Sequence, residues 1–82
     1  MTVIEIPFHR IKDCDHDQFM IINRASNYAL GIALWCREQG LKMNDDFEWA
    51  VKTEERKLVF SFFNNAEKFA SMVALKFGDG HG

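Results

Sequence analysis

The chain opens with a segment in which apolar positions dominate. Residues 2–11 are rich in β-branched and aromatic side chains, and the apolar ones are Val3, Ile4, Ile6, Phe8 and Ile11. This composition is typical of a strand. Because Pro7 has no backbone N–H to donate, we expect the strand at a sheet edge or at a bulge.

Residues 18–25 fit two structures. In one, residues 19–22 form a short buried strand, and a helix capped at Ser26 or Asn27 follows. In the other, a single long helix begins near Asp15. Its apolar positions, spaced at the helical period of about 3.6 residues, are Ile22, Ala25, Ala29, Ile32, Ala33 and Cys36. This spacing favours the long helix, whereas Gly31 and the β-branched pair at residues 21–22 weaken it.

In both structures the helix runs through Trp35 and ends at Gly40. Arg37 lies in its last turn. Glycine adopts the left-handed conformation that follows a helix C-terminus without the penalty that a Cβ atom brings.

Two segments with a period of two follow. Residues 46–53 place Phe47, Trp49 and Val51 on one face, and residues 57–63 do the same with Leu58, Phe60 and Phe62. Residues 54–56 lie between them as a turn. We therefore predict a hairpin of two half-buried strands.

A second helix is predicted after Asn64. Glu67 follows three residues later, which is the spacing of a capping box in which the Asn side chain accepts from free N–H groups. Gly78 stands where a C-cap is expected, and residues 79–82 are predicted to be a frayed tail. The apolar stripe of this helix consists of Ala66, Phe69, Ala70, Val73, Ala74 and Phe77.

These elements have the order β(β)αββα and predict an α+β fold. An antiparallel sheet of three to four strands, with two helices on one face, buries both helical stripes. The ferredoxin-like fold, or a shortened variant of it, has this arrangement. At 82 residues, we expect one domain over residues 1–78.

Charge and cysteine content limit the function classes. The formal net charge is −2, which disfavours a protein whose main task is to neutralise phosphates. Residues 1–10 contain no apolar segment of the kind that directs secretion, so we expect Cys14 and Cys36 to be reduced thiols in a cytoplasmic protein. The longest nearly apolar stretch, residues 28–36, is far shorter than the ~20 residues that span a bilayer.

Candidate metal sites and catalytic sets are incomplete. Residues 13, 15 and 17 are Asp, as in the first half of a calcium loop, but Gln18 and Arg24 stand where glycine and a bidentate glutamate are required. Cys14 and His16 form one loose pair of zinc ligands where structural sites use two pairs. No nucleophile elbow, HExxH, P-loop or GxGxxG motif is present. We predict a protein that is not an enzyme and has no metal or other cofactor, although Cys14 and His16 leave a metal possible.

Residues 57–70 resemble the third strand and second helix of an RNA-recognition motif, in which strand aromatics stack on bases. The glycines of that motif are absent, and Phe60 and Phe62 share a face with Leu58, so we expect them under the helices. The opposite face is a poor stacking platform. An RNA-binding domain that uses this face of the 46–63 hairpin is the alternative hypothesis.

Large apolar side chains exceed what a core of this size requires, which is typical of a protein-binding surface. Trp35 lies off the apolar stripe of its helix, and outward-facing leucines beside it would give that helix a second apolar face. The candidate partner-binding residues are Trp35, Leu30, Leu34, Tyr28, Met43 and Phe63. We expect a protein partner or self-association, through a sheet edge or the Trp35 face.

Residues 28–78 also resemble small accessory proteins of tailed bacteriophages. The likeness is carried by residues 35–40 (WCREQG), Trp49, residues 60–66 (FSFFNNA) and residues 75–78 (LKFG). It implies a non-enzymatic module that binds and modulates a host or phage protein in the host cytoplasm. It assigns no functional residue.

Overall fold

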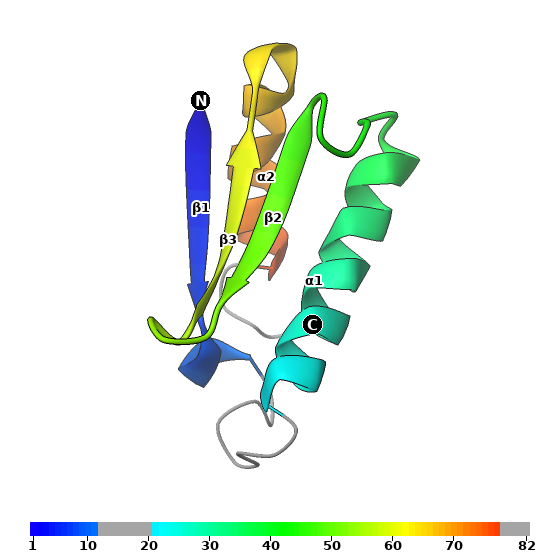
Figure 1. Ribbon diagram of the computed structural model, residues 1–82. Coiled ribbons are helices and arrows are strands. Elements are labelled where there is room, and N and C mark those ends of the chain that lie inside the picture. The colour runs from blue at the N-terminus through cyan, green and yellow to red at the C-terminus, as the bar shows by residue number, and fades with distance from the viewer. Residues whose placement is uncertain (12–20, 78–82) are drawn as a thin grey trace.

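The computed structural model describes residues 1–11 and 21–77 (Figure 1). Three strands form one antiparallel sheet: β1 (Thr2–Pro7), β2 (Phe47–Lys52) and β3 (Lys57–Phe62). Their spatial order is β1-β3-β2. The predicted hairpin is confirmed, and Pro7 lies on an edge strand as expected.

Two helices complete the fold, α1 (Ile21–Glu38) and α2 (Lys68–Phe77). In Figure 1 both lie on the same side of the sheet, and α1 packs on β2 while α2 packs on β1. The α+β prediction is therefore confirmed. Strands β1 and β2 run parallel with β3 between them, antiparallel to both. This is the split βαβ arrangement of the ferredoxin-like fold, in the shortened three-stranded form.

The strand alternative for residues 19–22 is wrong where it can be judged. Ile21 and Ile22 are the first residues of α1, and residues 26 and 27 lie inside the helix rather than at its N-cap. Residues 12–20, including the predicted start near Asp15, lie outside the described residues.

The strand register explains which face is buried. Ile4 and Trp49 both lie opposite Phe60, so these three side chains share the face that the helices cover. The buried side chains form one cluster drawn from all five elements and the turns between them. Its largest members are Phe8, Phe47, Phe60, Phe62, Ile6, Ile32 and Leu58.

The end of α1 is the one expected from Gly40. This residue has a φ of 90°, and the Leu41 N–H donates to the Cys36 carbonyl (3.1 Å) while the Gly40 N–H donates to the Arg37 carbonyl (3.0 Å). These two bonds define a Schellman motif. Gly78, the predicted cap of α2, is outside the described residues.

The predicted capping box at Asn64 is wrong. Residues Asn64–Glu67 form a 3-10 turn ahead of α2, with Phe63 at the N-cap position and no side-chain cap hydrogen bond. Asn64 itself has a φ of 52°, which is not the extended conformation of an N-cap.

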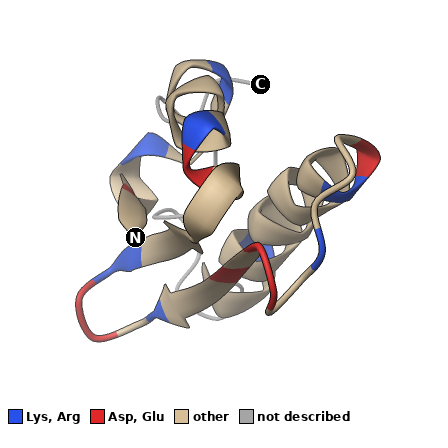
Figure 2. Ribbon diagram, turned by 90° about the horizontal axis from the view of Figure 1, so that it is seen from above, with Lys and Arg blue, Asp and Glu red and all other residues tan. Residues whose placement is uncertain are grey.

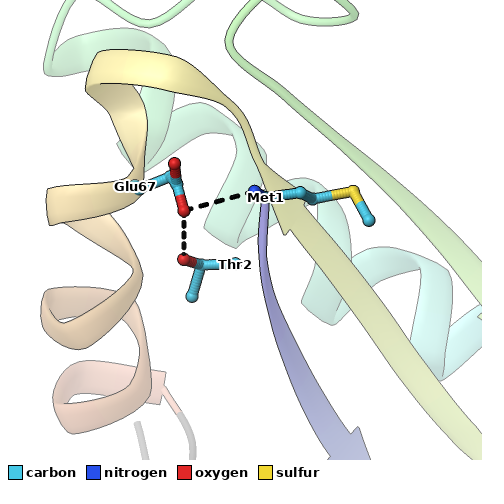
Figure 3. Close-up of polar contacts among 3 residues, drawn as sticks. All are labelled: Met1, Thr2 and Glu67. Atoms are coloured by element: carbon cyan, nitrogen blue, oxygen red, sulfur yellow. Dashed lines mark hydrogen bonds and ion pairs between the residues drawn. The ribbon is translucent and has the colours of Figure 1, made fainter.

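Glu67 instead joins the 3-10 turn ahead of α2 to the start of β1 (Figure 3). Its Oε2 accepts a hydrogen bond from the Thr2 hydroxyl (2.6 Å) and lies 3.4 Å from the amino group of Met1. The Thr2 hydroxyl, and then the Met1 amine, lower the pKa of the Glu67 carboxyl. The carboxylate thus ties two segments that are 65 residues apart in sequence.

Candidate interaction surface

Trp35 lies where the two helices meet. It is half-buried, and its ring makes edge contacts with Phe69 (centroids 6.3 Å apart, planes at 72°) and with Phe77 (6.1 Å, 71°). Such T-shaped pairs add to the energy of burial. Both of these ring partners belong to α2.

Tyr28 makes a second contact between α1 and α2, at the C-terminal end of α2. Its hydroxyl donates to the Phe77 carbonyl oxygen (2.7 Å), and the two rings meet edge to face at 6.3 Å. The bond satisfies a carbonyl in the last turn of α2, where no intrahelical donor is available. Tyr28 and Trp35, seven residues apart, therefore hold α2 against one flank of α1.

A shallow open hollow lies beside this contact. It is lined by Trp35 and Gln39 from one side and by Met72, Leu75 and Lys76 from the other. We call these five residues the helix groove. Met72 and Leu75 are 47% and 86% exposed, so the groove carries apolar surface that the fold leaves uncovered.

Two lysines of α2 lie beside the helix groove. Lys68 and Lys76, the only charged residues of α2, stand 5.6 Å and 5.8 Å from the ring centroids of Phe69 and Phe77. The charged residues of α1 are Arg24, Arg37 and Glu38, so this helix also has a positive formal charge. Figure 2 shows both basic positions of α2 in blue. The two helices are thus cationic in a chain whose net charge is −2.

The six residues predicted to bind a partner do not form one surface. Only Trp35 and Tyr28 lie at the α1–α2 contact. Leu30 and Leu34 are exposed, at 54% and 56%, and the helical period puts them on the opposite flank of α1. The residues that complete the groove, Met72 and Leu75, were missed, although their positions off the apolar stripe of α2 were a readable signal.

Met43 and Phe63 lie at the end of the sheet near the C-terminus of α1. Met43 forms a bridge with Phe47, and the Phe63 N–H donates to the Asp46 carbonyl (2.9 Å). Met43 is 36% exposed and Phe63 is half-buried. Neither residue lines the helix groove.

The outer face of the sheet carries small and charged side chains. On the three strands it presents no aromatic residue, because Phe60 and Phe62 are fully buried under the helices as expected. Lys57 on this face is paired with Glu5, which raises the Lys57 pKa. The stacking platform that an RNA-recognition motif requires is therefore absent from the strands.

The described cysteine and histidine side chains do not form a reactive or metal-binding site. Burial raises the pKa of the Cys36 thiol to about 11, which makes it a poor nucleophile. His9 is exposed. Within residues 1–11 and 21–77 no three His, Cys, Asp or Glu side chains gather as a metal site. Asp13, Cys14, Asp15, His16 and Asp17 lie outside these residues.

No described helix is both long and apolar enough to cross a membrane. Comparisons with protein-family models, with curated proteins and with solved structures found no match. The resemblance to phage accessory proteins therefore stays a prediction.

Proposed function

We propose that the protein is a non-enzymatic binding module whose helix groove takes an acidic, amphipathic helical segment of a partner protein. The observation that carries this proposal is the exposed pair Met72 and Leu75, set beside Trp35 and flanked by Lys68 and Lys76.

The apolar part of the groove supports a helical ligand. Helices dock through side chains spaced three and four residues apart, and an open hollow between two helices offers one row of contacts to such a stripe. Met72 is unbranched and flexible, which suits it to an irregular apolar ligand surface. Trp35 is half-buried, and tryptophan is one of the residue types enriched among binding hot spots.

The charges support an acidic ligand. Lys68 and Lys76 stand on either side of the apolar pair along α2, and their ammonium groups lie over aromatic rings with no carboxylate of α2 beside them. Carboxylates beside the ligand's apolar stripe would pair with them. Such pairs add rate and specificity more than affinity, and salt weakens them.

A library of random peptides displayed for selection against the intact chain tests this proposal. The recovered sequences should carry apolar residues at i, i+3 or i+4, and i+7, with Asp or Glu beside them. Their binding should be lost in the double variant Met72→Lys/Leu75→Lys, which changes exposed side chains only.

The matched control is Leu30→Lys/Leu34→Lys, which alters two exposed leucines on the other flank of α1 and should leave peptide binding unchanged. The proposal is wrong if no peptide is recovered, or if the recovered peptides bind the Met72→Lys/Leu75→Lys variant as well as the natural chain. If the natural chain binds vesicles of anionic lipid as tightly as it binds the recovered peptides, the proposal is also wrong, and the groove is better explained as a membrane-binding surface.

A further inference from the structure

The edge of β2 has a feature that the proposed function does not use. In the order β1-β3-β2, β2 pairs with β3 on one side only. The Phe63 N–H donates to the Asp46 carbonyl, which makes residues 46 and 63 a hydrogen-bonded pair. Bonding alternates along an antiparallel ladder, so Glu48, Ala50 and Lys52 bond towards β3. The N–H and C=O groups of Trp49 and Val51 therefore point to the open edge.

One end of this edge is already taken. The Phe47 carbonyl accepts from the Asn44 N–H (2.7 Å), and Met43 bridges to Phe47. The loop before β2 thus covers the edge at Phe47. Within residues 1–11 and 21–77, no strand or loop pairs with the outward N–H and C=O groups of Trp49 and Val51. Such an edge accepts a strand from another chain.

We propose that two copies of this chain pair through their β2 strands, antiparallel and centred on Ala50, to form one continuous six-stranded sheet. In this register Trp49 lies opposite Val51 of the second copy, and the two residues exchange both backbone hydrogen bonds. The two-fold axis repeats the exchange. Ala50 meets its own copy at the axis, where its small side chain lets the strands approach.

Charge selects this register. When the two strands are centred on Ala50, Glu48 lies directly opposite Lys52 of the second copy. This is a non-hydrogen-bonded pair, in which side chains are closest. Both residues are exposed on the outer face, and neither has an ion pair within the described part of the chain. If the pairing were centred on Val51 instead, Glu48 would lie opposite Glu54 of the second copy. If it were centred on Trp49, the second strand would collide with the loop at Phe47.

The helix layer is compatible with this pairing. Helix α1 lies on β2, so the two α1 helices would run side by side across the axis. The flank of α1 that faces away from α2 carries Leu30 and Leu34, both more than half exposed. These leucines would meet their copies and bury apolar surface that the monomer leaves in water.

The edge of β1 lacks these features. Its outward backbone groups include Pro7, which has no N–H to donate. The Glu5 carboxylate is already paired with Lys57. The β2 edge is therefore the one whose charges and backbone groups suit a second copy.

Charge reversal tests both the dimer and its register. Light scattering over a concentration series should show the natural chain passing from its 9.5 kDa monomer to twice that mass. Glu48→Lys or Lys52→Glu alone sets like charges opposite each other in both symmetric pairs and should weaken association about tenfold or more. A mixture of the two single variants pairs opposite charges again and should form a heterodimer of the natural affinity.

A cysteine at the axis tests the geometry directly. In a Cys14→Ser chain, Ala50→Cys should cross-link to its copy on oxidation, because the two Cα atoms would lie within the range of a disulfide. Ser61→Cys, on the same face but on the central strand, should not. A natural chain that stays monomeric throughout, or single variants that associate like the natural chain, would overturn the proposal.

These outcomes are separate from those of the proposed function. The helix groove lies on the flank of α1 that faces α2, away from Leu30 and Leu34. A monomeric chain can still bind an acidic peptide, and a dimer can form when no peptide binds. If both proposals hold, the dimer presents two grooves and gains avidity for a partner with two binding segments.

Discussion

The Tyr28 hydroxyl donates to the Phe77 carbonyl oxygen at 2.7 Å. This bond joins the middle of α1 to the last residue of α2, so it stabilises the contact on which the helix groove depends.

Removal of that hydroxyl tests its role. We expect Tyr28→Phe to lower the free energy of unfolding by about 1 kcal/mol, because the ring contact remains while the carbonyl loses its donor. Urea denaturation measures the loss. Hydrogen exchange should also quicken in the last turn of α2 more than in β3, and unchanged exchange at residues 75–77 would contradict this role.

The two described glycines of the α1 region provide a matched pair. Gly40 has a φ of 90°, whereas Gly31 lies inside α1, and a Cβ at either would meet no atom within 4 Å. We expect Gly40→Ala to destabilise the protein by about 1 kcal/mol through backbone strain. Gly31→Ala should stabilise it by up to about 1 kcal/mol. Changes of the same sign in thermal unfolding would contradict the conformations assigned to these residues.

Glu67 makes stability depend on pH. Its pKa is lower in the folded protein than its ordinary value of 4.5, first because of the Thr2 hydroxyl and then because of the Met1 amine. Since the folded-state pKa is depressed, the stabilisation is present above the unfolded-state pKa and is lost as the pH falls through the folded-state value.

The free energy of unfolding should therefore fall less steeply in acid for Glu67→Gln than for the natural chain. Denaturation curves recorded from neutral pH to about pH 3 measure the difference. Glu54→Gln, which removes an exposed carboxylate with no ion pair among the described residues, is the control and should keep the natural slope. Parallel curves for the natural chain and Glu67→Gln would be the contrary result.

The Cys36 thiol should be unreactive in the folded state. Its side chain is fully buried and its pKa is raised to about 11, so about one thiol in a thousand is ionised at pH 8. In a Cys14→Ser chain, alkylation by iodoacetamide should be slow in buffer and fast in denaturant. Equal rates in the two conditions would show that Cys36 is accessible in the native protein.

The sequence predicts the parts of the fold that depend on local periodicity. The six apolar positions assigned to one stripe of α1 are buried apart from Ile22 in its first turn. The alternation in β2 and β3 likewise separates the inner face from the outer one. Gly40 could be identified as the end of α1 from the sequence, because a glycine C-cap depends only on the local backbone conformation.

Features that depend on distant residues could not be predicted. The spacing of Asn64 and Glu67 is that of a capping box, but Glu67 binds Thr2, which lies on a strand brought beside it only by the fold. The helix groove needs the packing of α2 on one flank of α1. For that reason Trp35 was identified from its residue type, while Met72 and Leu75 opposite it were missed.

Fluorescence of Trp35 tests the central claim most directly. Trp49→Phe leaves Trp35 as the sole tryptophan of the chain, and Trp35→Phe leaves Trp49 at the β2 edge as the matched control. Titration with an acidic peptide recovered by selection should shift the Trp35 emission to shorter wavelength, with an apparent affinity that falls as salt is raised, and should leave the Trp49 emission unchanged. A peptide that binds without changing the Trp35 emission would contradict the assignment of the helix groove as the binding site.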